Sequence, residues 1–164
     1  DGYLKITDRK KDIIVNSSGK NIAPQKIEAM LKTVPMVSQA VVFGDKRKQL
    51  IALIMLDEQT VTQYACEQGW NFNNYAELIE RPEIVKMIRQ EIDARSSALA
   101  DYERIGNFHI LATDLSVDAG ELTATLKIKR NVVANNYAEI IAKLYKEDRA
   151  KVSGKNLAVV GSAR

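Results

Sequence analysis

The sequence predicts an α+β domain in which a small N-terminal β-hairpin is followed by a sheet of about three strands flanked by helices. Three observations support this prediction. Short aliphatic and β-branched runs alternate with polar turns, which is typical of strands, and longer segments carry apolar residues at helical spacing. The length of 164 residues, with 46% hydrophobic and 27% charged side chains, suits one compact domain with its own core.

The N-terminal segment is predicted to form the hairpin. Residues 3–15 contain two short apolar runs on either side of a charged stretch, which predicts two strands joined by a solvated turn. Residues 16–21 are rich in Ser, Asn and Gly, which favours a loop. Pro24 then stands where a first helical turn begins, and the apolar spacing after it predicts a helix over residues 24–33.

The middle of the chain is predicted to contain an antiparallel strand pair and two helices. Residues 37–43 and 50–56 are β-branched and aliphatic runs with a polar connection between them. Asp57 can cap a short helix, and residues 69–75 are polar and aromatic, as in a loop. A second, longer helix is expected to begin at Pro82, with a buried face formed by Val85, Ile88, Ile92 and Leu99.

The last part of the chain is predicted to add a strand, an extended segment and a helix. Residues 108–111 form the short strand, and the apolar alternation over residues 122–128 predicts the extended segment, with Lys127 on its polar side. The last helix buries Val133, Tyr137, Ile140, Ile141 and Leu144. We therefore expect one domain over residues 1–145 and a tail over residues 146–164 whose order the sequence leaves open.

The composition argues against several functional classes. No apolar run approaches the ~20 residues of a membrane-spanning helix, and a formal net charge of +3 is too small to indicate nucleic-acid binding by itself. One His and one Cys cannot supply a zinc site or an internal disulfide, so no metal site is predicted and Cys66 is expected to be a buried hydrophobe. The chain begins at Asp1 without Met or a targeting signal, so we expect it to be a piece of a longer protein.

Two basic segments are the candidates for chemistry, although each has an ordinary structural explanation when it is taken alone. The charged turn over residues 8–12 has the composition of a solubilising hairpin tip. Lys127 and Lys129 have the pattern of lysines that protect an edge strand. Their order along the chain, together with the segments around them, carries more information than either does by itself.

Taken in order, these segments resemble one enzyme family. DGYLKITDRKKDIIV at residues 1–15, followed by SGKNIAPQKIE at residues 18–28, closely resembles the start of the C-terminal domain of the adenylate-forming acyl-CoA synthetases. LADYERI at residues 99–105 and GELTATLKIKR at residues 120–130 are similar to the branch that acts on long-chain fatty acids. Several motifs with compatible spacing are far more specific than any one of them.

The resemblance covers residues 1–145 and implies the fold of the small, mobile C-terminal lid domain of these enzymes. Family enzymes activate a carboxylic acid with ATP to give an acyl-adenylate and pyrophosphate, and then transfer the acyl group to the thiol of coenzyme A (CoA). The domain is expected to swing between the two half-reactions, presenting a different face to the same site. One departure, Ala124 in place of the usual Pro, is expected to loosen the approach to Lys127.

The resemblance also implies roles for individual residues. Lys127 matches the catalytic lysine that reaches into the site in the first step, where its charge stabilises the negative charge that develops at the α-phosphate. Arg9 matches an arginine that contacts the nucleotide, and Lys11 matches the hinge about which the domain rotates. The loop that faces the CoA channel is matched by Ser18, Gly19, Lys20 and Asn21.

The implied reaction needs ATP, Mg²⁺, CoA and a fatty acid. ATP and Mg²⁺ are expected to be bound mainly by the larger N-terminal domain of the same polypeptide, which is absent from this chain, so the isolated domain is expected to be inactive. The parent enzyme is expected to be cytoplasmic, with peripheral membrane association left open, and to bind no nucleic acid. The alternatives are another acid-activating ligase of the family or, less favoured by the motifs, a basic nucleic-acid-binding or interaction domain.

Overall fold

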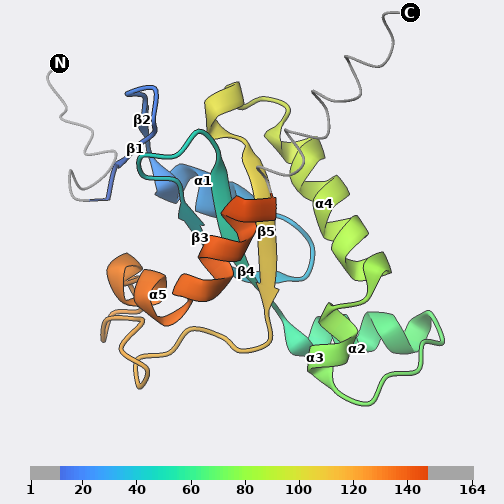
Figure 1. Cartoon of the computed structure of the whole chain (residues 1–164). Coiled ribbons are helices and arrows are strands. Elements are labelled where there is room, and N and C mark those ends of the chain that lie inside the picture. Colours follow the sequence, from blue (N-terminus) through green and yellow to red (C-terminus); the bar gives the residue numbers. More distant parts are fainter. Residues whose placement is uncertain (1–11, 148–164) are drawn as a thin grey trace, which may run out of the picture.

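The computed structural model of the chain describes residues 12–147 and has the predicted α+β architecture (Figure 1). Its elements in chain order are β1 (Ile14–Val15), β2 (Asn21–Ile22), α1 (Pro24–Leu31), β3 (Val37–Phe43), β4 (Leu50–Leu56), α2 (Glu58–Glu67), α3 (Tyr75–Ile79), α4 (Pro82–Ser96), the 3-10 helix η1 (Asp101–Glu103), β5 (Ile105–Leu111) and α5 (Arg130–Asn136). After a turn at Tyr137, residues 138–147 are helical again. A two-stranded hairpin, β1–β2, precedes a three-stranded sheet, as predicted.

The three-stranded sheet has the order β3-β4-β5. Strands β3 and β4 are antiparallel, with Val41 opposite Leu53, which confirms the predicted pair. Strand β5 runs parallel to β4 and places His109 beside Leu53. A parallel neighbour requires a long crossover, and the helices α2, α3 and α4 provide it between the two strands.

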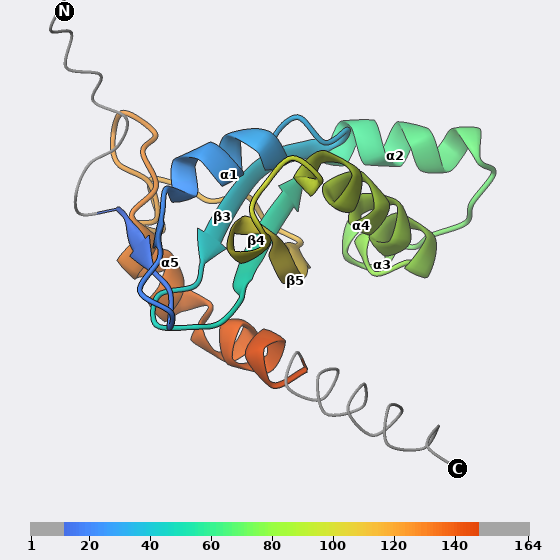
Figure 2. The ribbon, with the colours of Figure 1, turned by 90° about the horizontal axis from the view of Figure 1, so that it is seen from above.

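Helices cover both faces of this sheet. Consecutive side chains of β4 point to opposite sides, and all of them are buried. One cluster joins alternate residues of the strand to α1 and α4; its members include Leu50, Ala52, Ile54, Leu56, Ile27, Leu31, Ile84, Ile88 and Ile92. The other cluster joins the remaining residues to the C-terminal part; its members include Ile51, Leu53, Met55, Leu115, Leu122, Val133 and Leu144. Figure 2 shows the sheet between α1 and α4 on one side and α5 with the following helix on the other.

Local signals fix the helix starts. Pro24 and Pro82 occupy the first turn of α1 and α4, where a missing N–H costs nothing. The Asp57 carboxylate accepts a hydrogen bond from the Thr60 N–H at 3.2 Å and caps α2, as predicted. The Asn74 side chain caps α3 in the same way, accepting from the Glu77 N–H at 2.9 Å, although the sequence analysis did not predict this short helix.

Three details of the predicted elements are wrong. The buried face of α4 contains Ile84 in place of Val85, which is exposed; Ile84, Ile88 and Ile92 follow one another at intervals of four along this face. Leu99 lies beyond the end of that helix. Cys66 is exposed on α2 rather than buried, because the inner face of that helix is formed by Val61 and Ala65.

The front hairpin also differs in its pairing. Strand β1 confirms the second predicted run, but its partner is β2, with Ile14 opposite Ile22. The first predicted run, residues 3–6, lies outside the described residues, as does the predicted tail, residues 146–164, except for its first two residues, which are helical. Within residues 12–147, the structure has no helix long and apolar enough to cross a bilayer.

Candidate functional site

The segment that contains Lys127 forms a tight loop, not the predicted extended strand. Leu122 and Ile128 form an isolated antiparallel bridge, and the chain reverses direction between them. The Thr123 N–H donates to the Lys127 carbonyl at 2.8 Å, and the Lys127 N–H donates to the Thr123 hydroxyl at 3.0 Å. These bonds span Ala124, so hydrogen bonds close the loop in the absence of the usual proline. We call residues 122–128 the Lys127 loop.

The residue immediately before Lys127 has an unfavourable conformation and environment. Leu126 has a φ of 61°, in the left-handed region, which costs a residue with a Cβ roughly 1–2 kcal/mol. Its N–H donates to the Thr123 carbonyl at 2.8 Å, which holds the turn in this conformation. The side chain is 69% exposed, the most exposed of the large hydrophobic residues between 12 and 147.

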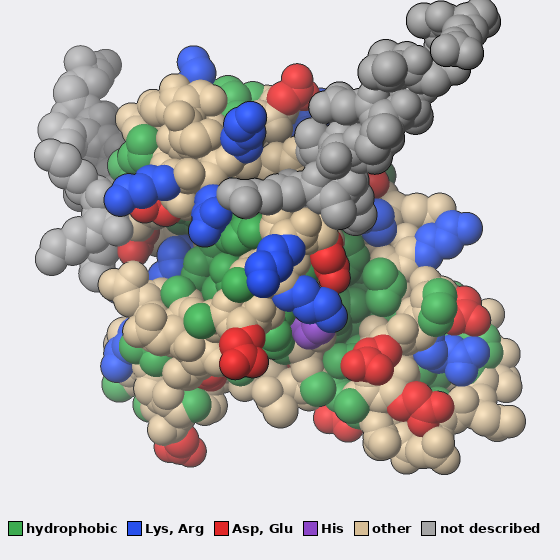
Figure 3. All heavy atoms as spheres, viewed as in Figure 1, with side chains coloured by type: hydrophobic (Ala, Val, Ile, Leu, Met, Phe, Trp, Pro, Cys, Tyr) green, Lys and Arg blue, Asp and Glu red, His purple; other side chains and the backbone are tan. Residues whose placement is uncertain are grey.

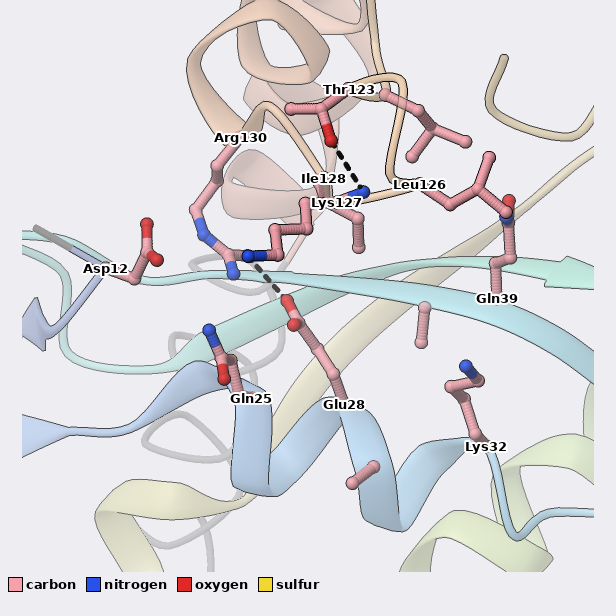
Figure 4. Close-up of a pocket in the computed structure, with 13 residues that line it drawn as sticks. Asp12, Gln25, Glu28, Lys32, Gln39, Thr123, Leu126, Lys127, Ile128 and Arg130 are labelled. Atoms are coloured by element: carbon pink, nitrogen blue, oxygen red, sulfur yellow. Dashed lines mark hydrogen bonds and ion pairs between the residues drawn. The ribbon is translucent and has the colours of Figure 1, made fainter. Parts of the chain in front are cut away.

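An open groove of about 700 Å³ lies between α1, β3 and the Lys127 loop. Its lining residues include Gln25, Glu28, Lys32, Gln39, Leu126, Lys127 and Arg130. Figure 4 shows the Lys127 side chain pointing from the loop into this groove. Within the described part of the chain, no carboxylate lies within ion-pair distance of its ammonium, so the charge is available to an incoming anion.

An ion pair anchors the base of the Lys127 loop. Arg130 Nη1 donates to Glu28 Oε1 at 2.6 Å and to the Val42 carbonyl at 2.7 Å (Figure 4). Glu28 Oε1 also accepts from the Val42 N–H at 2.9 Å. The Glu28 side chain is 9% exposed and the Arg130 side chain is 19% exposed, so the pair is largely removed from water. It therefore joins α1, the edge of β3 and the start of α5, and it satisfies both backbone groups of Val42.

Sequence reasoning missed the role of this pair. Glu28 is a carboxylate directly after the buried Ile27 and one helical turn before the buried Leu31, so a charge on the inner half of α1 was the available signal. A charge in such a position needs a partner of opposite sign. The partner, Arg130, is 102 positions away in the sequence, and no local pattern indicates it.

The predicted CoA-facing loop is a turn organised by Asn16. The buried Asn16 side chain accepts hydrogen bonds from the N–H groups of Ser18 at 3.0 Å and Lys20 at 2.9 Å. Gly19 has a φ of 76°, and an added Cβ would meet nothing within 4 Å. Asn21 is in strand β2 and not in the loop, so only part of the predicted segment is irregular. Sequence analysis placed the turn but did not identify Asn16 as the residue that closes it.

This turn contacts a second motif segment. The Lys20 ammonium lies 6.0 Å from the centre of the Tyr102 ring in η1, at the outer limit of a cation–π contact. Nearby, Lys26 pairs with Glu103 at 3.4 Å. The segments around residues 18–21 and 99–105, which are far apart in the sequence, therefore meet at one surface.

The structure keeps the two candidate surfaces apart. In Figure 1 the β1–β2 hairpin lies at the upper left, whereas the orange segment that contains the Lys127 loop lies at the lower left. Arg9 and Lys11 lie outside the described residues, so the structure does not place them. In the part of the chain that the structure describes, the Lys127 groove and the Gly19 turn therefore lie on different surfaces.

The charged side chains form no continuous stripe on the face drawn in Figure 3, where Lys and Arg are interspersed with Asp and Glu. His109, the sole histidine of the sequence, is also visible there. Partial burial lowers the pKa of His109, and the nearby Lys143 charge lowers it further. Among residues 12–147, no group of three or more His, Cys, Asp or Glu side chains could hold a metal ion.

The curated relatives of the chain include long-chain fatty acid–CoA ligases. The chain is 37% identical over 155 residues to the long-chain-fatty-acid–CoA ligase FadD15 of Mycobacterium tuberculosis, covering 90% of this chain and 25% of the relative. It is 32% identical over 149 residues to the peroxisomal long chain acyl-CoA synthetase 7 of Arabidopsis thaliana, covering 89% and 21%. The chain thus spans about a quarter of the length of these curated relatives or less.

The fold also matches a solved structure, the A-PCP didomain of carboxylic acid reductase from Segniliparus rugosus in complex with AMP. The TM-score is 0.71 with 22% sequence identity, over 96% of this chain and 20% of that one, which is a likeness of fold. Residues 11–149 match the family described as the AMP-binding enzyme C-terminal domain. This match covers most of the chain, including the groove, the Lys127 loop and the Gly19 turn, and the chain therefore belongs to the family of AMP-binding enzyme C-terminal domains.

Proposed function

We propose that residues 1–145 are the mobile C-terminal domain of an ATP-dependent long-chain fatty acid–CoA ligase. The first half-reaction joins the acid to ATP, giving acyl-AMP and pyrophosphate; in the second, the CoA thiol displaces AMP and gives acyl-CoA. The long-chain relatives support the choice of substrate. The observation that carries the proposal is the Lys127 ammonium, which has no partner within residues 12–147 and points into a groove.

Lys127 is proposed to serve the first half-reaction. An anionic carboxylate must approach an anionic phosphate while negative charge increases at the phosphorus centre. A compact ammonium directed at that point stabilises the transition state most when water is excluded. The closed loop supports this role because the hydrogen bonds of Thr123 fix the backbone from which the lysine extends.

The other roles are assigned to separate parts of the domain. Arg9 is proposed to contact the nucleotide, because its planar guanidinium suits ribose and phosphate oxygens. Lys11 is proposed to be the hinge. The turn over Ser18, Gly19, Lys20 and Asn21 is proposed to face the CoA channel. ATP and Mg²⁺ are assigned mainly to the larger domain of the same polypeptide, which we propose works in the cytoplasm.

The function is tested with the full-length enzyme that contains this chain. Incubated with ATP, Mg²⁺ and CoA, it should form acyl-CoA from palmitate far faster than from acetate or an aromatic acid, as measured by chromatography of the thioester. Preference for a short or aromatic acid would instead favour another acid-activating ligase. Failure to release pyrophosphate with any acid would contradict the assignment as a ligase.

The 164-residue chain alone is expected to form no acyl-CoA. Differential binding of the transition state requires the ATP and fatty acid sites of the larger domain. The measurement is thioester formation from palmitate, ATP, Mg²⁺ and CoA, with the full-length enzyme as the positive control. Turnover by the chain alone would contradict the two-domain interpretation.

Gly19→Ala in the full-length enzyme is expected to slow thioester formation by about 10- to 100-fold and to spare adenylation. The isolated domain has room for the added Cβ, so steric conflict arises only when the turn approaches the pantetheine arm of CoA. The matched control is Gly69→Ala. Gly69 also has a left-handed φ, 69°, with nothing within 4 Å of an added Cβ, so it imposes a similar backbone cost at a different place. Equal rates for the two variants would remove Gly19 from the CoA-facing surface.

Lys11→Pro in the full-length enzyme is expected to trap one pose of the domain. Proline fixes φ near −65°, whereas a hinge must adopt two backbone conformations. Adenylation should survive best, because thioester formation requires the rotation that follows. Lys11→Ala, which removes the charge but leaves the backbone free, should have a mild effect on separately assayed half-reactions. If the folded Pro variant matches the wild type in both, Lys11 is not the hinge.

A further inference from the structure

We infer that the Leu126 side chain is an apolar contact that seats the Lys127 loop against the larger domain during adenylation. The inference rests on the proposed function and adds a positioning residue to it. Its starting point is the exposure of 69% at a leucine whose backbone has a φ of 61°. Both features are unfavourable in this domain by itself, where Gly or Asn would satisfy the backbone and would not expose an apolar side chain.

The hydrogen bonds of the loop show that this exposure is built into the fold. The Leu126 N–H donates to the Thr123 carbonyl, and the Thr123 hydroxyl receives the N–H of Lys127. The tip therefore presents Leu126 and Lys127 from one rigid turn. Both side chains line the same groove, and Figure 4 shows them on different sides of the loop.

This geometry indicates which surface Leu126 contacts. If the Lys127 ammonium reaches the α-phosphate, the groove that both side chains line faces the larger domain, so Leu126 lies at the same interdomain surface. We identify the partner as an apolar patch at the rim of the nucleotide site in the larger domain. Burial of this leucine would offset the two unfavourable features and would fix the distance over which Lys127 extends. Because the contact forms only in the adenylation pose, its loss should affect that half-reaction alone.

The test compares three variants of the full-length enzyme. Leu126→Asn keeps a residue that tolerates a positive φ but removes the apolar side chain; the expected result is a 10- to 100-fold fall in the adenylation rate, as burial of a leucine predicts, with unchanged thioester formation from supplied acyl-adenylate. Leu126→Met should restore most of the adenylation rate. Val117→Asn is the matched control, because Val117 is an exposed apolar residue that does not line the groove, and it should leave both half-reactions unchanged.

The outcomes separate this inference from the function on which it rests. If Lys127→Ala is selective for adenylation and Leu126→Asn has the rate of Val117→Asn, the seating contact is refuted and the function stands. An equal loss of both half-reactions in Leu126→Asn also refutes it, because a general folding defect would act in that way. If Lys127→Ala is not selective, the proposed function itself has failed. A melting temperature of Leu126→Asn at or above that of the wild type, with slow adenylation, is the result that supports the inference most strongly.

Discussion

Glu28→Ala is expected to destabilise the domain by about 3 kcal/mol, the lower end of the range of roughly 3–5 kcal/mol for breaking a buried ion pair. Within residues 12–147, the substitution leaves the largely buried guanidinium of Arg130 with the Val42 carbonyl as its remaining acceptor. It also removes the acceptor of the Val42 N–H. The lower end applies because Arg130 keeps 19% of its side-chain surface exposed. Urea unfolding of the 164-residue chain, followed by circular dichroism, measures the change.

The matched control for this ion pair is Asp93→Ala, which breaks the pair of Asp93 with Arg89 on the exposed face of α4. Exposed pairs at this spacing contribute only about 0.3–0.5 kcal/mol, so a small change is expected. Glu28→Gln should lie between the two, because the amide oxygen still accepts a hydrogen bond while the charge is lost. A free energy of unfolding for Glu28→Ala equal to that of Asp93→Ala would show that the Glu28–Arg130 pair does not hold the loop to the domain.

Lys127→Ala in the full-length enzyme is expected to reduce the adenylation rate by about 10²- to 10³-fold, the range for removing one preorganised charge or donor from a transition state. Thioester formation from supplied acyl-adenylate should be largely retained, since the proposed rotation then presents another face of the domain. The fold should be unaffected, because the Lys127 side chain is exposed and has no partner within residues 12–147. Acid-dependent exchange of pyrophosphate into ATP measures the first step alone.

Lys129→Ala provides the matched control for Lys127. Lys129 is two positions along the chain, is also exposed, and stands at the start of α5 without lining the groove. Its removal should leave both half-reactions near the wild-type rate. If Lys129→Ala shows the selective loss of adenylation, or if Lys127→Ala slows both steps equally, the role assigned to Lys127 is wrong.

Elements with strong local signals could be predicted from the sequence. Strands β3 and β4 were predicted with their bounds, since aliphatic runs flank a polar turn there. The start of α2 was predicted because the Asp57 side chain can itself accept the capping hydrogen bond. Tertiary facts could not be predicted in this way. The parallel pairing of β5 with β4 depends on which strand lies beside which, and the pattern of a buried strand contains no such information.

The candidate site shows the same limit at the level of single residues. Resemblance to the family's motifs singled out Lys127 and Gly19 as candidates. The alternation of Leu122, Ala124, Leu126 and Ile128, however, predicted a strand where the chain forms a loop. Period-two alternation cannot distinguish the two, and here the Thr123 hydroxyl and the positive φ of Leu126 decide the conformation. Neither the Glu28–Arg130 pair nor the bonds of Asn16 follow from residue type alone.

The central claim is that two separate surfaces of one domain serve two successive half-reactions. The most direct test measures both half-reactions in parallel, in the same preparations of the full-length enzyme, for Lys127→Ala and Gly19→Ala. The account predicts opposite defects: slow adenylation with normal thioester formation for Lys127→Ala, and normal adenylation with slow thioester formation for Gly19→Ala. Loss of the same half-reaction in both variants, or equal loss of both steps in each, would contradict it.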